Sequence, residues 1–205
     1  MLWLTARVPV IDRTLGQDRA TALHARLGQL TFGGLVAHAV FLLGGYAFAD
    51  QLTVLAEFLS LWGIGDFVLA VVALLLLTAV SVSSVVALKK ALPFEAWKAI
   101  HLVTYAAVLA GLPHQFSLGD VFAGGLAHWY WVAVWLATFF VILCFRVFRP
   151  LFFSLEHRLV VTAVEHEASD VVSITMTGRR LADLDASAGQ YFHWRFLAPG
   201  FWWHQ

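Results

Sequence analysis

The sequence has few charged residues. Asp, Glu, Lys and Arg make up 13% of its 205 residues, and apolar residues make up 60%; soluble domains average about 25% and about 45–50% respectively. The shortage is greatest from 27 to 148, where nine of 122 residues are charged. A surface with so little charge is not solvated by water. The composition therefore excludes an ordinary soluble protein and predicts a mainly α membrane protein.

Cysteine and net charge are also scarce. The single cysteine, Cys144, excludes an intrachain disulfide and any cysteine-based zinc or iron–sulfur site. Thirteen basic residues balance thirteen acidic residues, and this balance gives no support for a nucleic-acid partner.

Long apolar runs are what the sequence does contain. A membrane-spanning helix needs about 20 predominantly apolar residues. One apolar stretch, at 51–62, is too short to span a bilayer, and we expect it to lie along the membrane interface. The sequence predicts a multi-span helical bundle in a lipid bilayer with four spans, at about 27–48, 67–88, 96–116 and 127–148.

The two loops at 49–66 and 117–126 contain no Lys or Arg. Basic residues instead precede the first span, separate the second from the third and follow the fourth. Cytoplasmic loops carry an excess of Lys and Arg. We therefore expect a multi-pass protein of the plasma membrane with both ends of this chain in the cytoplasm.

The pattern changes after Arg149 and Pro150. Residues 158–164 are rich in β-branched side chains, whereas 172–177 and 189–196 alternate apolar and polar residues, as half-buried strands do. The sequence predicts a transmembrane domain over 1–150, followed over 151–205 by an incomplete antiparallel β-barrel.

Four of the nine histidines lie in or beside the spans. His24 and His38 are 14 residues apart, about 21 Å along a helix and close to four whole turns. His101 and His114 are 13 residues apart, and spans one and three run in the same direction. We therefore expect His24 to face His101 at the cytoplasmic level and His38 to face His114 at the outer level. Two imidazoles projecting toward a common centre suit the axial positions of a haem iron.

The third span departs from this regular geometry. On an ideal helix 13 residues stop about 140° short of four turns, so His101 and His114 do not align. Gly111 and Pro113 precede His114, and proline kinks helices. We expect a local distortion there. The alternative is that each histidine is a hydrogen-bonded packing residue.

The histidine segments, LHARLGQLTFGGLVAHAV and AWKAIHLVTYAAVLAGLPHQ, with FRVFRPL and GQYFHWRF after them, resemble the ferric reductase-like transmembrane domain. Ferric-chelate reductases and NADPH oxidases share this domain. The chain resembles members of the family in which it is fused to a ferredoxin-reductase-type FAD-binding domain, of which only the start would be present. The resemblance implies two haem b groups: an inner one held by His24 and His101, and an outer one held by His38 and His114. It also implies electron transfer from cytoplasmic NAD(P)H through FAD and the haems to an external acceptor, either ferric iron or oxygen.

The chain also departs from that family. The family usually has six spans, and the opening residues 1–19 are similar to the end of a preceding helix. The main flavin motif is expected beyond Gln205, so we expect an oxidoreductase fragment that is inactive alone. Arg19, Arg26 and Lys98 are candidate partners for haem propionates, although they could serve only to set topology. Two other functions remain open: a haem-bearing subunit served by a separate reductase, and a non-enzymatic membrane protein with structural histidines.

Overall fold

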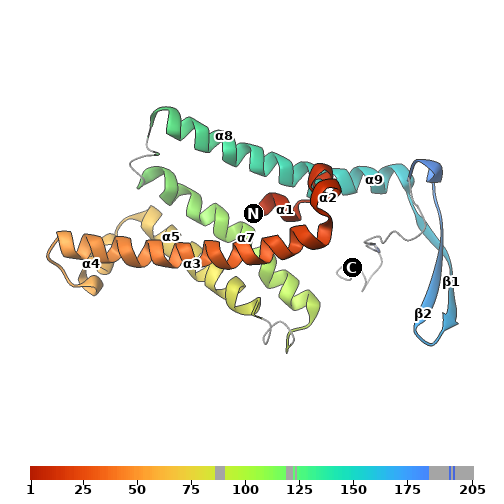
Figure 1. Cartoon of the computed structure of the whole chain (residues 1–205), viewed down its shortest axis with the longest axis horizontal. Coiled ribbons are helices and arrows are strands. Elements are labelled where there is room, and N and C mark those ends of the chain that lie inside the picture. Colours follow the sequence, from red (N-terminus) through yellow and green to blue (C-terminus); the bar gives the residue numbers. More distant parts are fainter. Residues whose placement is uncertain (86–90, 119–121, 123, 185–193, 195, 197–205) are drawn as a thin grey trace.

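The computed structural model of the chain describes residues 1–85, 91–118, 122, 124–184, 194 and 196 (Figure 1). A helical bundle precedes a β-hairpin that lies beyond one end of the bundle. The elements are α1 (Leu2–Thr5), α2 (Pro9–Leu15), α3 (Gln17–Ala49), α4 (Val54–Leu61), α5 (Gly65–Ser83), α7 (Phe94–Ser117), α8 (Gly125–Ile142), the π-helical η2 (Leu143–Phe148), α9 (Arg149–His157), β1 (Val160–Ala168), β2 (Val171–Thr177) and the 3-10 turn η3 (Leu181–Leu184).

Within the described residues, three helical stretches are long and apolar enough to cross a membrane. They are α3, α5 and the continuous helix Gly125–His157 that α8, η2 and α9 form together. They contain the first, most of the second, and the fourth predicted spans. The third prediction, 96–116, forms α7, which has 24 residues but is not one of the three. This helix carries Glu95 and Lys98 as well as its two histidines, and these polar residues interrupt its apolar run.

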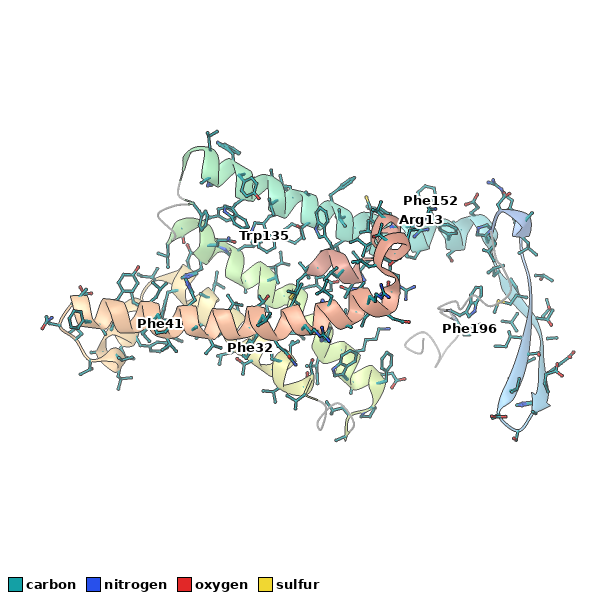
Figure 2. The ribbon with its side chains drawn as sticks, in the orientation of Figure 1. Arg13, Phe32, Phe41, Trp135, Phe152 and Phe196 are labelled. Atoms are coloured by element: carbon teal, nitrogen blue, oxygen red, sulfur yellow. The ribbon has the colours of Figure 1, made fainter. Side chains whose placement is uncertain are left out.

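The bundle has the inverted burial expected of a membrane protein. Its buried apolar residues are small, mostly alanines such as Ala73 and Ala107, whereas Phe41 and Phe152 are 77% and 72% exposed. Figure 2 shows large apolar side chains projecting outward along the helices. A bilayer covers such surfaces at no cost, because lipid tails are as apolar as the side chains.

Small residues bring α5 and α7 together along their length. A Cβ placed on Gly111 would lie 3.6 Å from the Cβ of Ala73, and Ala107, one turn earlier on α7, is buried. Close helix packing in membranes depends on such small side chains. Since α3 contacts α5 less closely, α5 and α7 form the most tightly packed part of the bundle.

Polar contacts connect the remaining helices. Trp3 on α1 donates its indole N–H to the Thr138 hydroxyl on α8 at 3.2 Å. Trp135 on α8 donates to Gln115 Oε1 on α7 at 3.0 Å. Each of these bonds satisfies a donor that has few water partners in an apolar environment.

The short apolar segment predicted at 51–62 contains α4. Thr53 caps this helix by accepting a hydrogen bond from the Ala56 N–H at 3.2 Å, as N-cap threonines do. With eight residues, α4 is too short to span a bilayer.

Glu57 on α4 is 2% exposed, and its Oε2 has no hydrogen-bond partner. An unsatisfied buried polar atom costs about 1–3 kcal/mol or more. We predict that Glu57→Met raises the melting temperature of the detergent-solubilised protein in a thermal unfolding scan. Asp50→Asn, at an exposed carboxylate, is the control and should leave it unchanged. A lower melting temperature in Glu57→Met would contradict the prediction.

The fourth span continues as a helix past the predicted domain boundary. Pro150 lies in the first turn of α9, where its missing N–H is tolerated. Because proline has no N–H, residue 150 donates no hydrogen bond to the carbonyl of Arg146, four residues earlier. Arg146 belongs to the π-helical η2. The boundary predicted between 150 and 151 therefore falls inside a continuous helix of 33 residues.

The hairpin confirms two of the three predicted strands. β1 and β2 pair antiparallel, from Val160 opposite Thr177 to Ala168 opposite Val171. β1 begins two residues later than predicted, because Arg158 adopts a left-handed conformation with φ 42° at the end of α9. Apart from Trp194 and Phe196, the third predicted strand, 189–196, lies outside the described residues. The described sheet has two strands, and the predicted barrel is not confirmed.

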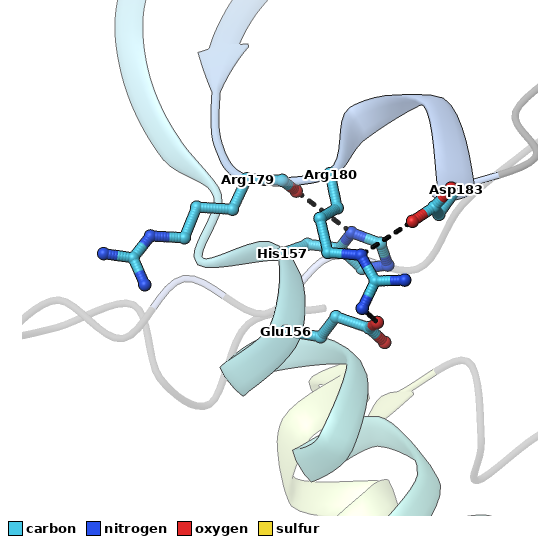
Figure 3. Close-up of polar contacts among 5 residues, drawn as sticks. All are labelled: Glu156, His157, Arg179, Arg180 and Asp183. Atoms are coloured by element: carbon cyan, nitrogen blue, oxygen red, sulfur yellow. Dashed lines mark hydrogen bonds and ion pairs between the residues drawn. The ribbon is translucent and has the colours of Figure 1, made fainter.

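A compact group of polar contacts fixes the hairpin to α9 (Figure 3). His157 is 2% exposed; its Nδ1 lies 3.2 Å from the Arg179 carbonyl, and its own carbonyl accepts the Arg179 N–H at 2.7 Å. Arg180 bridges Glu156 at 2.5 Å and Asp183 at 2.7 Å. The hydrogen bond to Asp183 and the nearby Glu156 charge raise the pKa of the Arg180 guanidinium. Residues on both sides of the hairpin thus hold it to the helix end.

Candidate functional site

The four span histidines form two pairs between α3 and α7. The ring centroids of His24 and His101 lie 6.1 Å apart with 69° between their planes. Those of His38 and His114 lie 6.4 Å apart with planes at 82°. The structure therefore brings together the partners that the sequence paired, at two levels of the same two helices.

The separation within each pair has room for one metal ion. An imidazole nitrogen binds a first-row metal at about 2.0–2.1 Å, and the ring centroid lies about 1.1 Å behind it, so two imidazoles on opposite sides of a metal have centroids about 6.3 Å apart. Both observed distances are close to this value.

The pairs lack the further ligands that a simple metal site needs. Among the described residues no group of three or more His, Cys, Asp or Glu side chains could hold a metal ion. A structural zinc ion takes four protein ligands, whereas a haem iron takes four nitrogens from its macrocycle and needs only axial ligands from the protein. Two histidines per site therefore suit a haem better than a bare ion.

Two ring nitrogens in the pairs have unmet hydrogen-bonding capacity. Nδ1 of His24 and Nδ1 of His114 are buried, and neither has a hydrogen-bond partner. Buried polar atoms are normally satisfied, so a histidine held this way by packing alone would be unfavourable. A metal bound at the other nitrogen of each ring would leave these Nδ1 atoms in need of partners, so the observation does not distinguish ligand histidines from packing histidines.

Pro113 does not interrupt α7, which is helical from Phe94 to Ser117. His114 nevertheless lies beside His38. Figure 1 shows α7 running obliquely to α3. Because the part of α7 that faces α3 changes along an oblique crossing, residues from different faces of α7 can meet α3 at different levels. The oblique crossing therefore contributes to the contact between His114 and His38, and α7 continues as a helix through Pro113.

The histidine face of α3 is open beside His38. Gly34 lies four residues before His38 and Gly45 seven residues after it, so both share its face. A Cβ on either glycine would meet no described atom within 4 Å, and close helix packing therefore does not explain them. Beside His24 the same face is occupied, because Met1 lies 3.2 Å from a Cβ placed on Gly28.

The three cations predicted to pair with propionates occupy different positions. Arg26 and Arg19 are exposed and lie about 200° and about 140° around α3 from His24. Lys98 places its Nζ 6.0 Å from the centroid of the Phe94 ring. The assignment of the three cations to haem propionates stays a prediction. Lys98 lies on the same helix as His101.

Sequence reasoning missed a fourth cation. The charge of Arg146, in η2, acts electrostatically on His24, and its guanidinium donates to the Tyr105 hydroxyl at 3.1 Å. Tyr105 lies one turn after His101, on the same face of α7. The spacing of four between His101 and Tyr105 was a usable signal, but nothing local connects either residue to Arg146.

Trp97 and Asp66 were also missed. The Trp97 indole stacks on the His101 ring, with centroids 5.0 Å apart and planes at 26°. The Asp66 carboxylate, in the first turn of α5, acts electrostatically on His114. Trp97 could have been found from its position four residues before His101, whereas Asp66 is remote in sequence from both outer histidines.

One comparison with known proteins finds a match. A sequence model of the family described as "Ferric reductase like transmembrane component" matches residues 1–112, more than half of the chain, including all of α3 and most of α7. Searches of curated proteins and of solved structures return no match. The matched range contains His24, His38 and His101 and ends two residues before His114. On this match, the chain belongs to the ferric reductase like transmembrane component family.

Proposed function

We propose that this membrane protein is an oxidoreductase that transfers electrons across a bilayer through two haem b groups. His24 and His101 hold one haem, and His38 and His114 hold the other. The observation that carries the proposal is the pair of ring separations, 6.1 Å and 6.4 Å, both close to the spacing of two axial imidazoles. The family membership supports the same function.

The chain supplies position and insulation. A haem held by these histidine pairs would supply one-electron chemistry. The residues of α3 and α7 hold the two pairs about 21 Å apart along α3, and the apolar helices exclude water. The Arg146 guanidinium, close enough to act on His24, stabilises negative charge at that level.

The distribution of basic residues supports a direction of transfer. The loops without Lys or Arg follow, along the chain, the halves of α3 and α7 that carry His38 and His114, and we assign this pair to the outer side of the plasma membrane. The β-hairpin follows the opposite end of the bundle, where the proposal places cytoplasmic NAD(P)H and FAD. The hairpin is proposed as the start of an FAD-binding domain, and the external acceptor as ferric iron or oxygen.

Absorbance spectroscopy of the purified protein tests the proposal. We predict that the detergent-solubilised chain, produced in a haem-sufficient host, shows low-spin b-type bands that sharpen on dithionite reduction. Haem quantification should give two haems per chain. His166→Ala is the control, because His166 lies on β1 and outside both pairs; it should change neither value. A colourless wild-type protein would contradict the proposal and favour structural histidines.

A further inference from the structure

The two pairs differ in what surrounds their rings. The contact between the rings is edge-on in both pairs, but His101 also has Trp97 stacked against it at 5.0 Å and 26°. An indole face that covers an imidazole restricts rotation of that imidazole about its Cβ–Cγ bond. One ring plane of the His24–His101 pair is therefore fixed by a neighbour that is not itself a ligand.

Trp97 is in turn supported from the start of α7. The Phe94 ring lies 5.9 Å from the Trp97 ring, tilted by 35°, and the Lys98 Nζ lies 6.0 Å from the centroid of the Phe94 ring. Phe94, Trp97 and His101 are spaced by three and four residues, the spacing that places side chains on one helical face. Aromatic pairs of this kind stabilise one another beyond what their area burial contributes. These three rings form a continuous series that ends at the histidine pair.

We propose that Trp97 is a positioning residue for the His24–His101 pair. By stacking on His101, it sets the plane of that imidazole and so the 69° angle between the two rings. The inference rests on the proposed function, since the angle has a redox consequence only if both rings ligate one iron. Neighbours that orient a ligand histidine also tune the metal that it holds.

The angle between the axial planes has a spectroscopic signature. Parallel imidazole planes separate the energies of the two iron orbitals that interact with the ligands, whereas nearly perpendicular planes leave them close in energy. The second arrangement gives a low-spin ferric EPR signal with a large maximum g value. Both pairs are nearly perpendicular, so two such signals are expected, and only one of them depends on Trp97.

A purely structural role would behave differently. Trp97 lies near one end of α7, where tryptophan also serves as an interfacial anchor. Loss of an anchor would lower the haem content or broaden both EPR signals, because the whole bundle would shift. Loss of a positioning contact changes one signal and leaves the haem count at two.

The test compares Trp97→Leu with Trp97→Phe and Trp129→Leu. Trp129, on α8, is exposed and serves as the matched tryptophan control. In Trp97→Leu we expect two haems per chain, a lower maximum g value or several g values for one signal, and a shifted midpoint potential for one haem. Trp97→Phe should restore most of the wild-type behaviour, and Trp129→Leu should match wild type. Two unchanged signals in Trp97→Leu would overturn the proposal, as would equal changes in both.

A second measurement does not need haem. In haem-free protein with labelled histidine, the Trp97 indole should shift the His101 ring protons upfield in the NMR spectrum. His101→Gln assigns the resonance. The upfield shift should disappear in Trp97→Leu and persist in Trp129→Leu; no shift in wild type would overturn the proposal. Failure of the proposed function would instead appear as a wild-type protein without haem.

Discussion

His38→Ala is expected to leave each chain with one haem instead of two. The substitution removes one axial ligand from the His38–His114 pair, and the remaining imidazole cannot hold a low-spin iron by itself. His24 lies about 21 Å from His38 along α3, so its ring contact with His101 at 6.1 Å does not depend on His38. Haem quantification and the low-spin absorbance bands measure the loss.

His24→Ala is the reciprocal variant and should remove the other haem. Redox titration distinguishes the two proteins, because each should retain a different one of the two midpoint potentials found in wild type. His128→Ala serves as the control, since His128 belongs to neither pair; its Nδ1 lies 2.7 Å from the Phe122 carbonyl. Retention of both haems in either ligand variant would reassign the ligands.

Gly178→Ala is expected to release the β-hairpin from the end of the long helix. A Cβ at this position would lie 2.5 Å from the His157 carbonyl oxygen and 2.7 Å from Leu159 Cδ2. The same carbonyl accepts the Arg179 N–H at 2.7 Å, so backbone must move and that hydrogen bond is lost. Overpacking of this kind costs about 1–3 kcal/mol. Faster amide exchange in β1 and β2, measured by mass spectrometry, is the expected result.

Gly65→Ala provides the comparison, because a Cβ on Gly65 meets no described atom within 4 Å. It should leave exchange in the hairpin at the wild-type rate. Amide exchange in α3 and α5 should stay slow in both variants, since the junction lies outside the bundle. Unchanged exchange in β1 and β2 of Gly178→Ala would show that the junction does not hold the hairpin.

Helices were predictable where the apolar run itself defines them, and their ends were not. The first span was predicted from residue 27, but α3 begins at Gln17, because polar residues in its first turns do not stop a helix. The fourth was predicted to end at about residue 148, but proline is tolerated in a first helical turn, and the helix runs on through Pro150 to His157.

The histidine pairing was predictable for a related reason. The spacing of two histidines within one helix predicts their depth in the membrane and the side of the helix on which they lie. This was enough to match His24 with His101 and His38 with His114. The contact at His114 also depends on how α7 crosses α3, which local sequence does not encode. Arg146 was missed on the same ground, because its neighbours His24 and Tyr105 come from two other helices.

The length of the continuous helix Gly125–His157 converts a small change in its tilt into a large displacement of its end. Its 33 residues span about 50 Å, longer than a hydrocarbon core of about 30 Å, and the contacts of His157 and Arg180 fix the hairpin to its end. A change in tilt of about 10° therefore moves that end sideways by about 9 Å. Helix tilt responds to bilayer thickness, so a change in the tilt of this helix displaces the hairpin that is fixed to its end.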